Sequence, residues 1–198
     1  MGTFTLGALS SVPASQRPDL LSANAREMLE RLGLLDQVGV VEIDPAVSDT
    51  AATQQEFGLD SDMLANCVVV GGKRKGAERL AACVVLATTR ADVNGTVRRY
   101  LDVRKASFLP MERAVDLTGM EYGGITPIGL PAEWPVLVDS RVTGRPAVVI
   151  GSGVRRSKIL LPGPVLAGLP NATVLEGLGI DADGTGPDGR TGAEQGRA

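Results

Sequence analysis

Apolar residues in the first third of the chain recur first at helical and then at strand spacing. Residues 19–32 carry apolar side chains three and four positions apart, which predicts a helix between Pro18 and Gly33. Residues 38–44 alternate between apolar and polar side chains and predict a strand. Residues 47–58 then predict a short helix, because a Ser-Asp pair precedes the pattern and a glycine ends it.

The longest apolar runs lie in the middle of the chain. Residues 66–72 and 79–88 predict two strands joined by the segment KRKGAE, which together form a β-hairpin with a basic tip. Both runs are almost wholly apolar, so we expect central strands that are covered on at least one side. Cys67 and Cys83 lie within these runs and are interpreted as buried, reduced thiols rather than as a disulfide.

The second half of the chain alternates helices with short strands. The pattern predicts helices at 91–103 and 110–119 around a brief extended piece at 105–109, then strands at 135–140, 146–153 and 157–161, a helical turn at 162–169 and a strand at 172–178. The result is one mixed α/β domain over residues 15–178, preceded by an N-terminal extension, 1–14. Residues 179–198 are glycine-rich and without periodicity, so they predict a disordered tail.

Composition narrows the chemistry. The 198 residues include no histidine, which excludes Ser-His-Asp and Cys-His nucleophilic machinery and the commonest zinc ligand. We therefore expect no metal and no cofactor. No apolar run approaches the roughly 20 residues that would span a bilayer, and the first ten residues make a poor signal peptide. These features favour a cytoplasmic protein without a membrane partner.

Charge is unevenly spread along the chain. Residues 1–62 hold 3 basic and 10 acidic side chains, whereas residues 63–113 hold 10 basic and 4 acidic ones. This asymmetry predicts a positive face that meets a polyanion, or else two solvated faces that partly neutralise each other. Charge alone does not choose between them.

Two glycine clusters carry the candidate chemistry. In TGMEYGGITPIGLP, residues 118–131, successive backbone N–H groups lie among few bulky side chains, so they could line a pocket and hold a carbonyl oxygen or an oxyanion. A tight turn before the next strand is the alternative. The second cluster, IGSGVRRSK at 150–158, ends a strand and precedes three basic residues, which suits a phosphate-bearing ligand or a plain strand-ending turn.

The order of these features resembles a known family. The segments FGLDSDMLANCVVV, RLAACVVLATTRADVNGTVRRYLDVRKASF, TGMEYGGITPIGLP, VLVDS and VVIGSG are similar to the YbaK and prolyl-tRNA-synthetase-associated domains, which edit aminoacyl-tRNA. The resemblance covers about residues 40–178. Its most specific part is GGITP, which matches the family's G-x-x-x-P motif at Gly123 and Pro127; VRKASF and the Asp139 of VLVDS are weaker matches.

The resemblance implies both a fold and an activity. The fold would be a mixed, largely antiparallel sheet or partly closed barrel surrounded by helices. The activity would be hydrolysis of the ester between a wrong amino acid and the 3′ end of a tRNA, with a pocket that admits small side chains and excludes larger ones. Water would attack with help from backbone groups and from a hydroxyl or thiol of the substrate. The partners would be aminoacyl-tRNA and an aminoacyl-tRNA synthetase, with the chain a monomer or a homodimer.

Three groups of candidate site residues follow. The catalytic candidates shape the aminoacyl pocket: Asn66, Gly123, Gly124, Thr126 and Pro127. The substrate-binding candidates line the remainder: Lys105, Asp139, Gly151, Ser152 and Gly153. The basic candidates would attract tRNA phosphates: Lys73, Arg74, Lys75, Arg98, Arg99, Arg155, Arg156 and Lys158. Asp139 either orients a pocket group or ends its strand, and Ser152 has no general base to make it a nucleophile.

Asn66 departs from the family pattern. Family members usually carry a lysine on the first hairpin strand, where it helps to hold the tRNA terminus, and Asn66 stands at that position. Asparagine donates a hydrogen bond but has no charge; Lys73, Lys75 and Lys105 are candidates to compensate. The alternative function is therefore a catalytically impaired homologue that binds tRNA or an aminoacyl group or regulates a partner. A small-molecule pocket unrelated to tRNA is the third reading.

Overall fold

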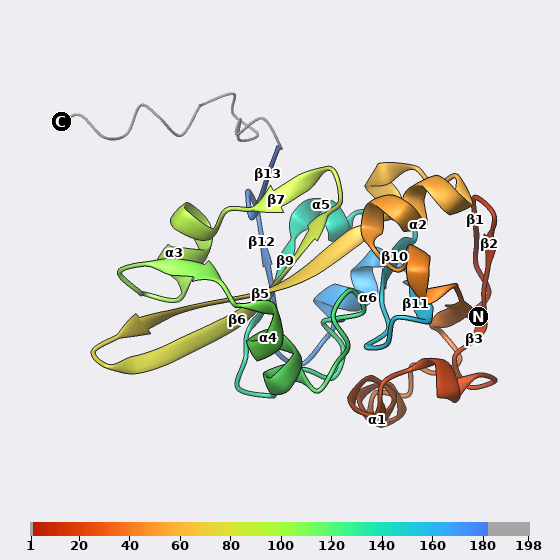
Figure 1. The fold of residues 1–198 in the computed structure, drawn as a ribbon, viewed down its shortest axis with the longest axis horizontal. Helices are drawn as coiled ribbons and strands as arrows, with labels where there is room; N and C mark the ends of the chain where they lie inside the picture. The colour runs from red at the N-terminus through yellow and green to blue at the C-terminus, as the bar shows by residue number, and fades with distance from the viewer. Residues whose placement is uncertain (1, 182–198) are drawn as a thin grey trace.

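The two apolar runs predicted as a hairpin form the longest strands, β5 (Ala65–Arg74) and β6 (Ala77–Leu86), in the computed structural model, which describes residues 2–181 (Figure 1). They pair antiparallel along their whole length. The other edge of β5 pairs with β8 (Ala106–Phe108). On the far side, β6 pairs in parallel with β9 (Val136–Asp139), and β9 in parallel with β12 (Ala172–Leu175). The hairpin is thus the centre of a mixed five-stranded sheet.

A second sheet of four strands is antiparallel throughout. Its order is β10 (Val148–Gly151), β11 (Ser157–Leu161), β4 (Gly39–Glu42) and β3 (Val12–Pro13). A bridge between Leu64 and Val149 joins this sheet to the start of β5. Two small ribbons, β1 (Thr5–Leu6) with β2 (Leu9–Ser10) and β7 (Thr89–Ala91) with β13 (Gly179–Asp181), complete the described strands.

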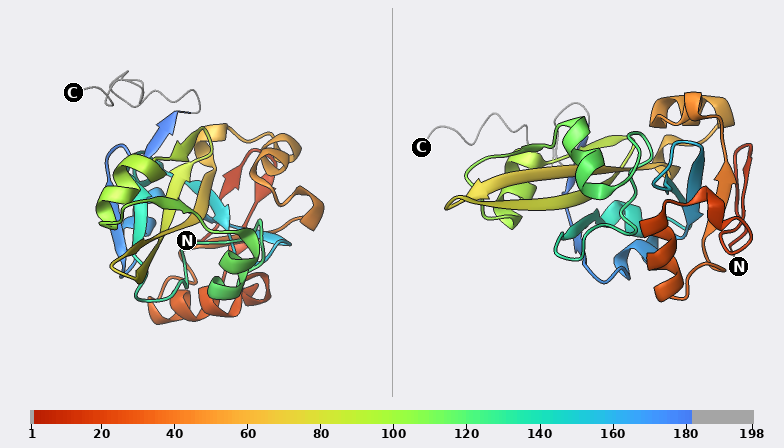
Figure 2. Two further views of the ribbon diagram at one scale, coloured as in Figure 1. Left: turned by 60° about the vertical axis from the view of Figure 1, so that its left-hand side comes forward. Right: turned by 60° about the horizontal axis from the view of Figure 1, so that its bottom comes forward.

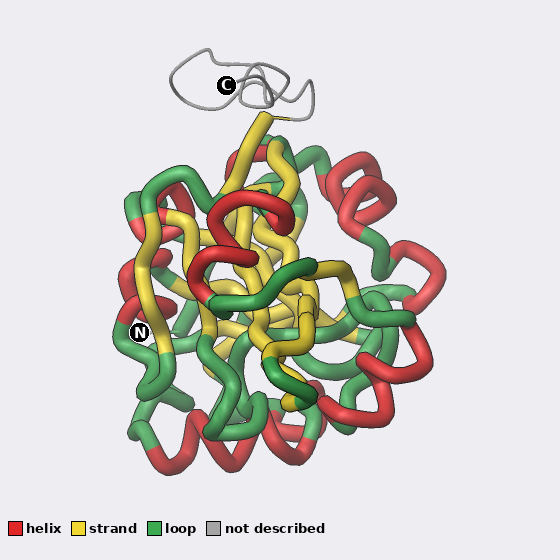
Figure 3. The backbone as a smooth tube through the Cα atoms, turned by 90° about the vertical axis from the view of Figure 1, so that its left-hand side faces the viewer, coloured by secondary structure: helices red, strands yellow, loops and turns green. Residues whose placement is uncertain are grey.

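The helices are short and surround the strands, as the tube in Figure 3 makes plain. The α-helices are α1 (Ala23–Arg31), α2 (Thr50–Phe57), α3 (Arg98–Tyr100), α4 (Met111–Thr118), α5 (Ser140–Thr143) and α6 (Gly163–Ala167). Single turns occur at η1 (Pro18–Leu20), η2 (Pro45–Val47), η3 (Ser61–Met63) and the π-type η4 (Val93–Val97). Left-handed glycines end two helices at the predicted positions, α2 at Gly58 and α4 at Gly119.

Both faces of β6 are buried from Ala81 to Leu86, as its apolar run predicts. Alternate residues of β6 point to opposite sides: Ala82 and Val84 belong to the core between the two sheets, whereas Ala81 and Cys83 belong to a second core under α3 and η4. Figure 2 shows the consequence for the shape. The hairpin projects from the rest of the molecule on one side, while the second sheet, α1 and α2 lie at the other.

Two helices differ from their predicted extent. The helix expected at 19–32 is split, because Leu21 is extended and the Ser22 hydroxyl accepts a hydrogen bond from Ala25 N–H, which begins α1. The helix expected at 91–103 begins with a π-type turn, because the Asp92 carboxylate accepts from the N–H groups of Gly95 and Thr96. Side-chain capping overrides the apolar spacing at both positions.

The edges of the domain also differ from the predicted ones. Residues 2–14, set apart as an extension, pack onto the second sheet: β3 pairs with β4, and Leu9 is fully buried. At the other end Gly179–Asp181 is a strand rather than the start of a tail. The rest of the predicted tail lies outside the described residues. Within residues 2–181, no helix is long and apolar enough to cross a membrane.

Candidate active site

A cavity of about 220 Å³ lies where the two sheets meet. Four segments wall it: the start of β5, the N-terminus of α2, the glycine-rich loop before β9, and the adjoining ends of β10 and β11. Asn66 and Gly123, two of the catalytic candidates, both line this cavity, and so does Gly151. The structure therefore brings the two glycine clusters of the sequence to one site.

The two glycine clusters contact each other through their backbones. A side chain at Gly151 would overlap the carbonyl oxygens of Gly124 and Ile125, and one at Gly124 would lie 2.6 Å from the carbonyl oxygen of Val154. Gly153 N–H also donates to the Gly124 carbonyl over 2.7 Å. The glycines are required because two chain segments approach closely, so the loop at 118–131 is a wall of the cavity as well as a connection.

Gly123 has a second requirement. Its φ is +81°, in the left-handed region that side-chain-bearing residues rarely adopt. A Cβ there would lie 2.7 Å from the Arg155 guanidinium and 3.2 Å from both Ser48 Oγ and Asp49 Oδ1. Any larger residue at this position would strain the backbone and displace the groups around the cavity.

Arg155 holds three of the surrounding segments together. Its guanidinium donates to the carbonyl oxygens of Tyr122 and Pro45, each over 3.0 Å, and its backbone N–H donates to the Glu121 carboxylate over 2.6 Å. It links the loop at 118–131 to the segment that precedes α2. Arg155, a candidate for tRNA phosphates, therefore uses its donors inside the protein.

Asn66 is oriented by α2. The Thr50 hydroxyl donates a hydrogen bond to the Asn66 side-chain oxygen over 2.5 Å, so these two neutral side chains are paired. This pair fixes the amide against the helix and adds no charge to the cavity.

Lys158 is the lysine that lines the cavity. It was expected to be a phosphate-binding residue beside Arg155 and Arg156, but its side chain is 6% exposed and its ammonium donates to the Ser48 carbonyl over 2.5 Å. Burial lowers the pKa of Lys158 to about 8; Asp49 opposes that shift, and Arg155 adds to it. The reason for the misplacement is that Lys158 lies within β11, whose residues are all buried, whereas Arg156 precedes the strand.

Comparison with known proteins decides the family. A model described as the aminoacyl-tRNA editing domain matches residues 44–169, more than half of the chain. The chain belongs to the aminoacyl-tRNA editing domain family. This confirms the resemblance found in the sequence. No curated protein matches the chain.

Solved structures share the fold of this editing domain. One, described as a proposed trans-editing enzyme for prolyl-tRNA synthetase, superposes with a TM-score of 0.65 at 24% identity and covers 79% of this chain and 97% of its own. A hypothetical protein gives 0.69 at 18% identity, covering 79% and 99%. A scaffold used for epitope grafting gives 0.65 at 24%, covering 81% and 99%. These likenesses confirm the mixed α/β, largely antiparallel fold.

Burial makes the two thiols of the editing domain weaker nucleophiles than an exposed cysteine. Burial raises the pKa of Cys83 to about 12 and that of Cys67, in the cavity wall, further still, so both stay protonated at neutral pH. Both cysteines are free, as the sequence predicts. Ser152 is fully buried and shares a 2.7 Å hydrogen bond with the Ser157 hydroxyl, so it serves the packing of the strand end.

Three further candidates lie away from the cavity wall. Thr126 and Pro127 belong to the loop at 118–131 but are buried and do not line the cavity. Thr126 N–H faces the Met120 sulfur. The Asp139 carboxylate is fully buried and accepts from the backbone and side chain of Arg141 and from Gly179 N–H. Of its two readings, the structure supports the one in which Asp139 ends its strand. It joins β9 to β13.

The basic candidates divide into two places. Lys73, Arg74, Lys75 and Lys105 surround the tip of the hairpin and border two surface hollows there, together with Arg104. Arg98 and Arg99 are exposed at α3. None of these residues lines the cavity.

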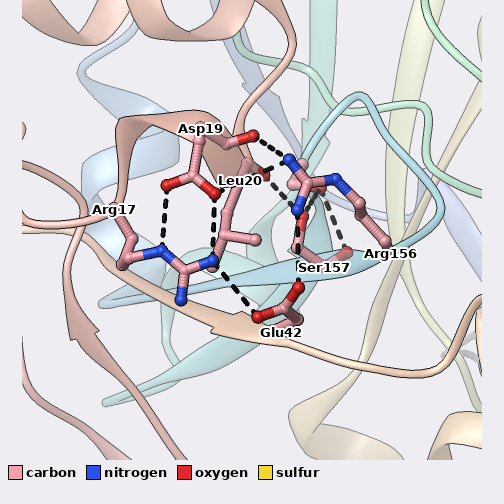
Figure 4. A network of polar contacts seen from close by, with 7 residues as sticks. Arg17, Asp19, Leu20, Glu42, Arg156 and Ser157 are labelled. Atoms are coloured by element: carbon pink, nitrogen blue, oxygen red, sulfur yellow. Dashed lines mark hydrogen bonds and ion pairs between the residues drawn. The ribbon is translucent and has the colours of Figure 1, made fainter.

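Arg156 belongs to an ion-pair network on the outside of the second sheet (Figure 4). Its guanidinium lies 3.4 Å from the Glu42 carboxylate and donates to the Asp19 carbonyl over 2.6 Å. Arg17 pairs with the same two acidic residues, which raises the pKa of Arg17 above its ordinary value. Arg156 thus has protein partners for the charge that was expected to meet phosphate.

Sequence reasoning missed the contribution of the segment before α2. Asp49 and Thr50 line the cavity, and Ser48 supplies a carbonyl to Lys158. Tyr122, next to the glycine pair, lines it too. The Ser-Asp-Thr run was visible only as a helix start. Within residues 2–181, no group of three or more Cys, Asp and Glu residues is placed to hold a metal ion.

Proposed function

We propose that the chain is a trans-editing hydrolase that deacylates mischarged aminoacyl-tRNA in the 220 Å³ cavity. The observation that carries this proposal is the meeting of Gly123 and Gly151 at one cavity in a chain of the editing family. The backbone-lined wall is what an ester-hydrolysing site without histidine needs, because N–H groups can stabilise charge that develops on a carbonyl oxygen.

We infer the nucleophile from the hydroxyl and thiol groups in and near the cavity. Burial raises the pKa of the Cys67 thiol, which disfavours its thiolate, and the Ser152 hydroxyl is buried in a hydrogen-bonded pair. Both observations favour direct attack by water on the ester carbon. The hydroxyl next to the ester on the terminal ribose could relay a proton from that water to the leaving ribose oxygen.

Selection would be made by size. The apolar part of the lining comes from aliphatic side chains such as Ala65, Ile125 and Val149, and the cavity has room for little more than a small aminoacyl group and part of a ribose. A pocket of this kind rejects larger side chains by exclusion, whereas it separates similar small ones only weakly.

Tyr122 is suited to hold the terminal adenine. It lines the cavity, is 53% exposed, and its carbonyl is fixed by Arg155. Exposed aromatic rings beside a site bind unpaired bases by stacking, worth about 1–3 kcal/mol per base. A tyrosine at the rim suits a substrate that ends in an unpaired adenosine.

The hairpin would extend the contact along the tRNA. Asn66, at the cavity, and Lys73, near the tip, are seven residues apart on β5, roughly 23 Å at the rise of a strand. The basic residues at the tip would meet phosphates of the acceptor stem and add a salt-dependent attraction.

The test is hydrolysis of tRNAs charged with alanine, serine, cysteine and proline, using Gly123→Leu and Gly33→Leu. Both glycines have a left-handed φ, but Gly33 has no neighbouring atom within 4 Å of a Cβ, so it reports the backbone strain alone. We expect the native protein and Gly33→Leu to hydrolyse one of these esters, and Gly123→Leu to leave the same ester intact.

Survival of every ester at high protein concentration would reject the hydrolase. If tRNA still bound, the impaired homologue that Asn66 suggests would be the function. If binding were also insensitive to salt between about 50 and 200 mM, a small-molecule site would be favoured.

A further inference from the structure

Two charged side chains of opposite sign line the cavity, on different walls. Lys158 comes from β11, and Asp49 precedes the first turn of α2. Asp49 raises the pKa of Lys158 against the effect of burial. The cavity therefore has a positive side chain on one wall and a negative side chain on another, although most of its lining residues are uncharged.

Lys158 has donors to spare. A lysine ammonium carries three N–H donors, and the Ser48 carbonyl takes one of them. Among the described residues the ammonium has no ion pair within 4 Å and no second hydrogen-bond acceptor. A 6% exposed cation with two free donors in a cavity wall is a group built to meet an oxygen of a ligand.

Asp49 is likewise available. It stands at the N-cap of α2, yet its side chain makes no capping hydrogen bond. One carboxylate oxygen lies against Gly123, 3.2 Å from where a Cβ would be, and within residues 2–181 no ion pair involves it. The N-terminus of α2 makes no use of the carboxylate, so the carboxylate is free to bind a cation at the cavity mouth.

We propose that this pair recognises the polarity of an aminoacyl ester, with Lys158 donating to the ester carbonyl oxygen and Asp49 accepting from the α-ammonium group. This inference rests on the proposed function, whose substrate carries both groups on adjacent carbons. It also explains how the site works with a neutral Asn66, since the positive charge is supplied from the opposite wall by Lys158.

In the reaction, water adds to the carbonyl carbon and the carbonyl π electrons move to the oxygen, which Lys158 faces. The electron pair then returns, the bond to the ribose oxygen breaks, and a proton from the water goes to that oxygen. Lys158 contributes its charge and gives up no proton overall. Asp49 holds the amino end in place, which aims the carbonyl at the ammonium.

The rate of ester hydrolysis should depend on the protonation state of Lys158. The charged groups facing it are Asp49 and Arg155, while Cys67, Thr50 and Asn66 on the other walls are neutral. The charged form is the active one, so kcat/KM should fall as the pH rises through about 8. The α-hydroxy analogue of the ester, which lacks the titratable amine, separates this fall from that of the substrate.

The first experiment compares Lys158→Met, Lys158→Arg and the control Arg90→Met on the aminoacyl ester and its α-hydroxy analogue. Arg90 is exposed on β7, away from the cavity. We expect Lys158→Met to lose about 100-fold in kcat/KM on both esters. Lys158→Arg should retain part of the rate without the fall near pH 8, and Arg90→Met should be unchanged. Native rates and an unmoved pH profile in both Lys158 variants would overturn the inference.

Asp49→Asn tests the other end of the pair. It should lose about tenfold on the aminoacyl ester and nothing on the α-hydroxy analogue, because only the first carries the ammonium. Equal losses on both esters would mean that Asp49 merely supports the fold, and this half of the proposal would be wrong.

The sharpest check moves the positive charge from position 158 to position 66, on another wall of the cavity. The double variant Asn66→Lys with Lys158→Met returns a cation to the opposite wall and should regain at least tenfold over Lys158→Met. No recovery, with a melting temperature like that of the native protein, would count against an electrostatic role.

Failure of the proposed function can be told apart from failure of this inference. If the native protein hydrolyses no ester, binding of 3′-amino-3′-deoxyadenosine carrying alanine in amide linkage decides the inference alone. Weaker binding by Lys158→Met and Asp49→Asn, but not by Arg90→Met, would support it. Equal binding by all four proteins, or none by the native protein, would overturn it.

Discussion

The two ends of β5 are built for different tasks. At its start, Asn66 lies in a wall fixed by backbone contacts, and the nearby Lys158 is buried. At its end, Lys73 and Lys75 are exposed on a hairpin that projects from the domain (Figure 2). One strand therefore connects a rigid cavity, where a small displacement changes the chemistry, to a solvated basic surface, where charge acts at long range. Substitutions at the two ends should differ in size and in the quantity they change.

The largest effect is expected where backbone meets backbone. Gly151→Ala places a methyl group against the carbonyl oxygens of Gly124 and Ile125, and should lower the free energy of unfolding by about 3 kcal/mol. Gly144→Ala is the matched control, because its methyl group would make only ordinary contacts, 3.7 Å from Ser140 O and 3.9 Å from Arg141 O. Urea unfolding measures both, and a Gly151→Ala protein as stable as Gly144→Ala would show that the wall is pliable.

The next effect concerns pH and stability. The folded-state pKa of Lys158, about 8, lies below the ordinary value of 10.5, so between these pH values the unfolded chain binds more protons. The native protein should therefore gain stability relative to Lys158→Met as the pH rises from 8 to 10, by about 2 kcal/mol. Urea midpoints at both pH values measure the difference between the two proteins. A constant difference would mean that Lys158 keeps its ordinary pKa in the fold.

The smallest effect belongs to the basic tip. Replacing Lys73 and Lys75 together by glutamine should raise KM for the tRNA substrate a few-fold and leave kcat unchanged. The slope of log binding constant against log salt should fall by roughly 1.5, since each lost phosphate contact removes about 0.7–0.9. Titrations at several salt concentrations measure it, with Arg90→Gln as control. A lower kcat with an unchanged salt slope would remove the distinction between the two ends.

The sequence predicted the scaffold better than the site. Periodicity located the hairpin, and left-handed glycines marked the ends of α2 and α4, because these features depend on local chain geometry. The loop at 118–131 was singled out from composition alone. Which residues meet at the cavity depends on how the two sheets join, at a single bridge between Leu64 and Val149, and nothing local encodes that contact.

The misplaced residues have physical causes as well. Lys158 and Arg155 lie in one basic run, but Lys158 is inside the buried strand β11 and Arg155 is in the turn before it, so their side chains meet different partners. Asp139 looks like a site carboxylate because it follows an apolar strand. Its partners, Arg141 and Gly179, become visible only in the fold, where β13 pairs with β7 and Gly179 N–H reaches the Asp139 carboxylate.

The contact between the two glycine clusters limits how the cavity can evolve or be redesigned. A side chain at Gly151 would overlap the carbonyl oxygens of Gly124 and Ile125, and one at Gly124 would overlap the backbone of Val154, so that wall has no atoms to trim and no room to add any. A variant with altered amino-acid preference must therefore be sought at lining residues that carry side chains, such as Cys67 and Val149, where side chains of different volume can be exchanged. Libraries that hold the glycines constant and vary those two positions would explore substrate range without dismantling the scaffold.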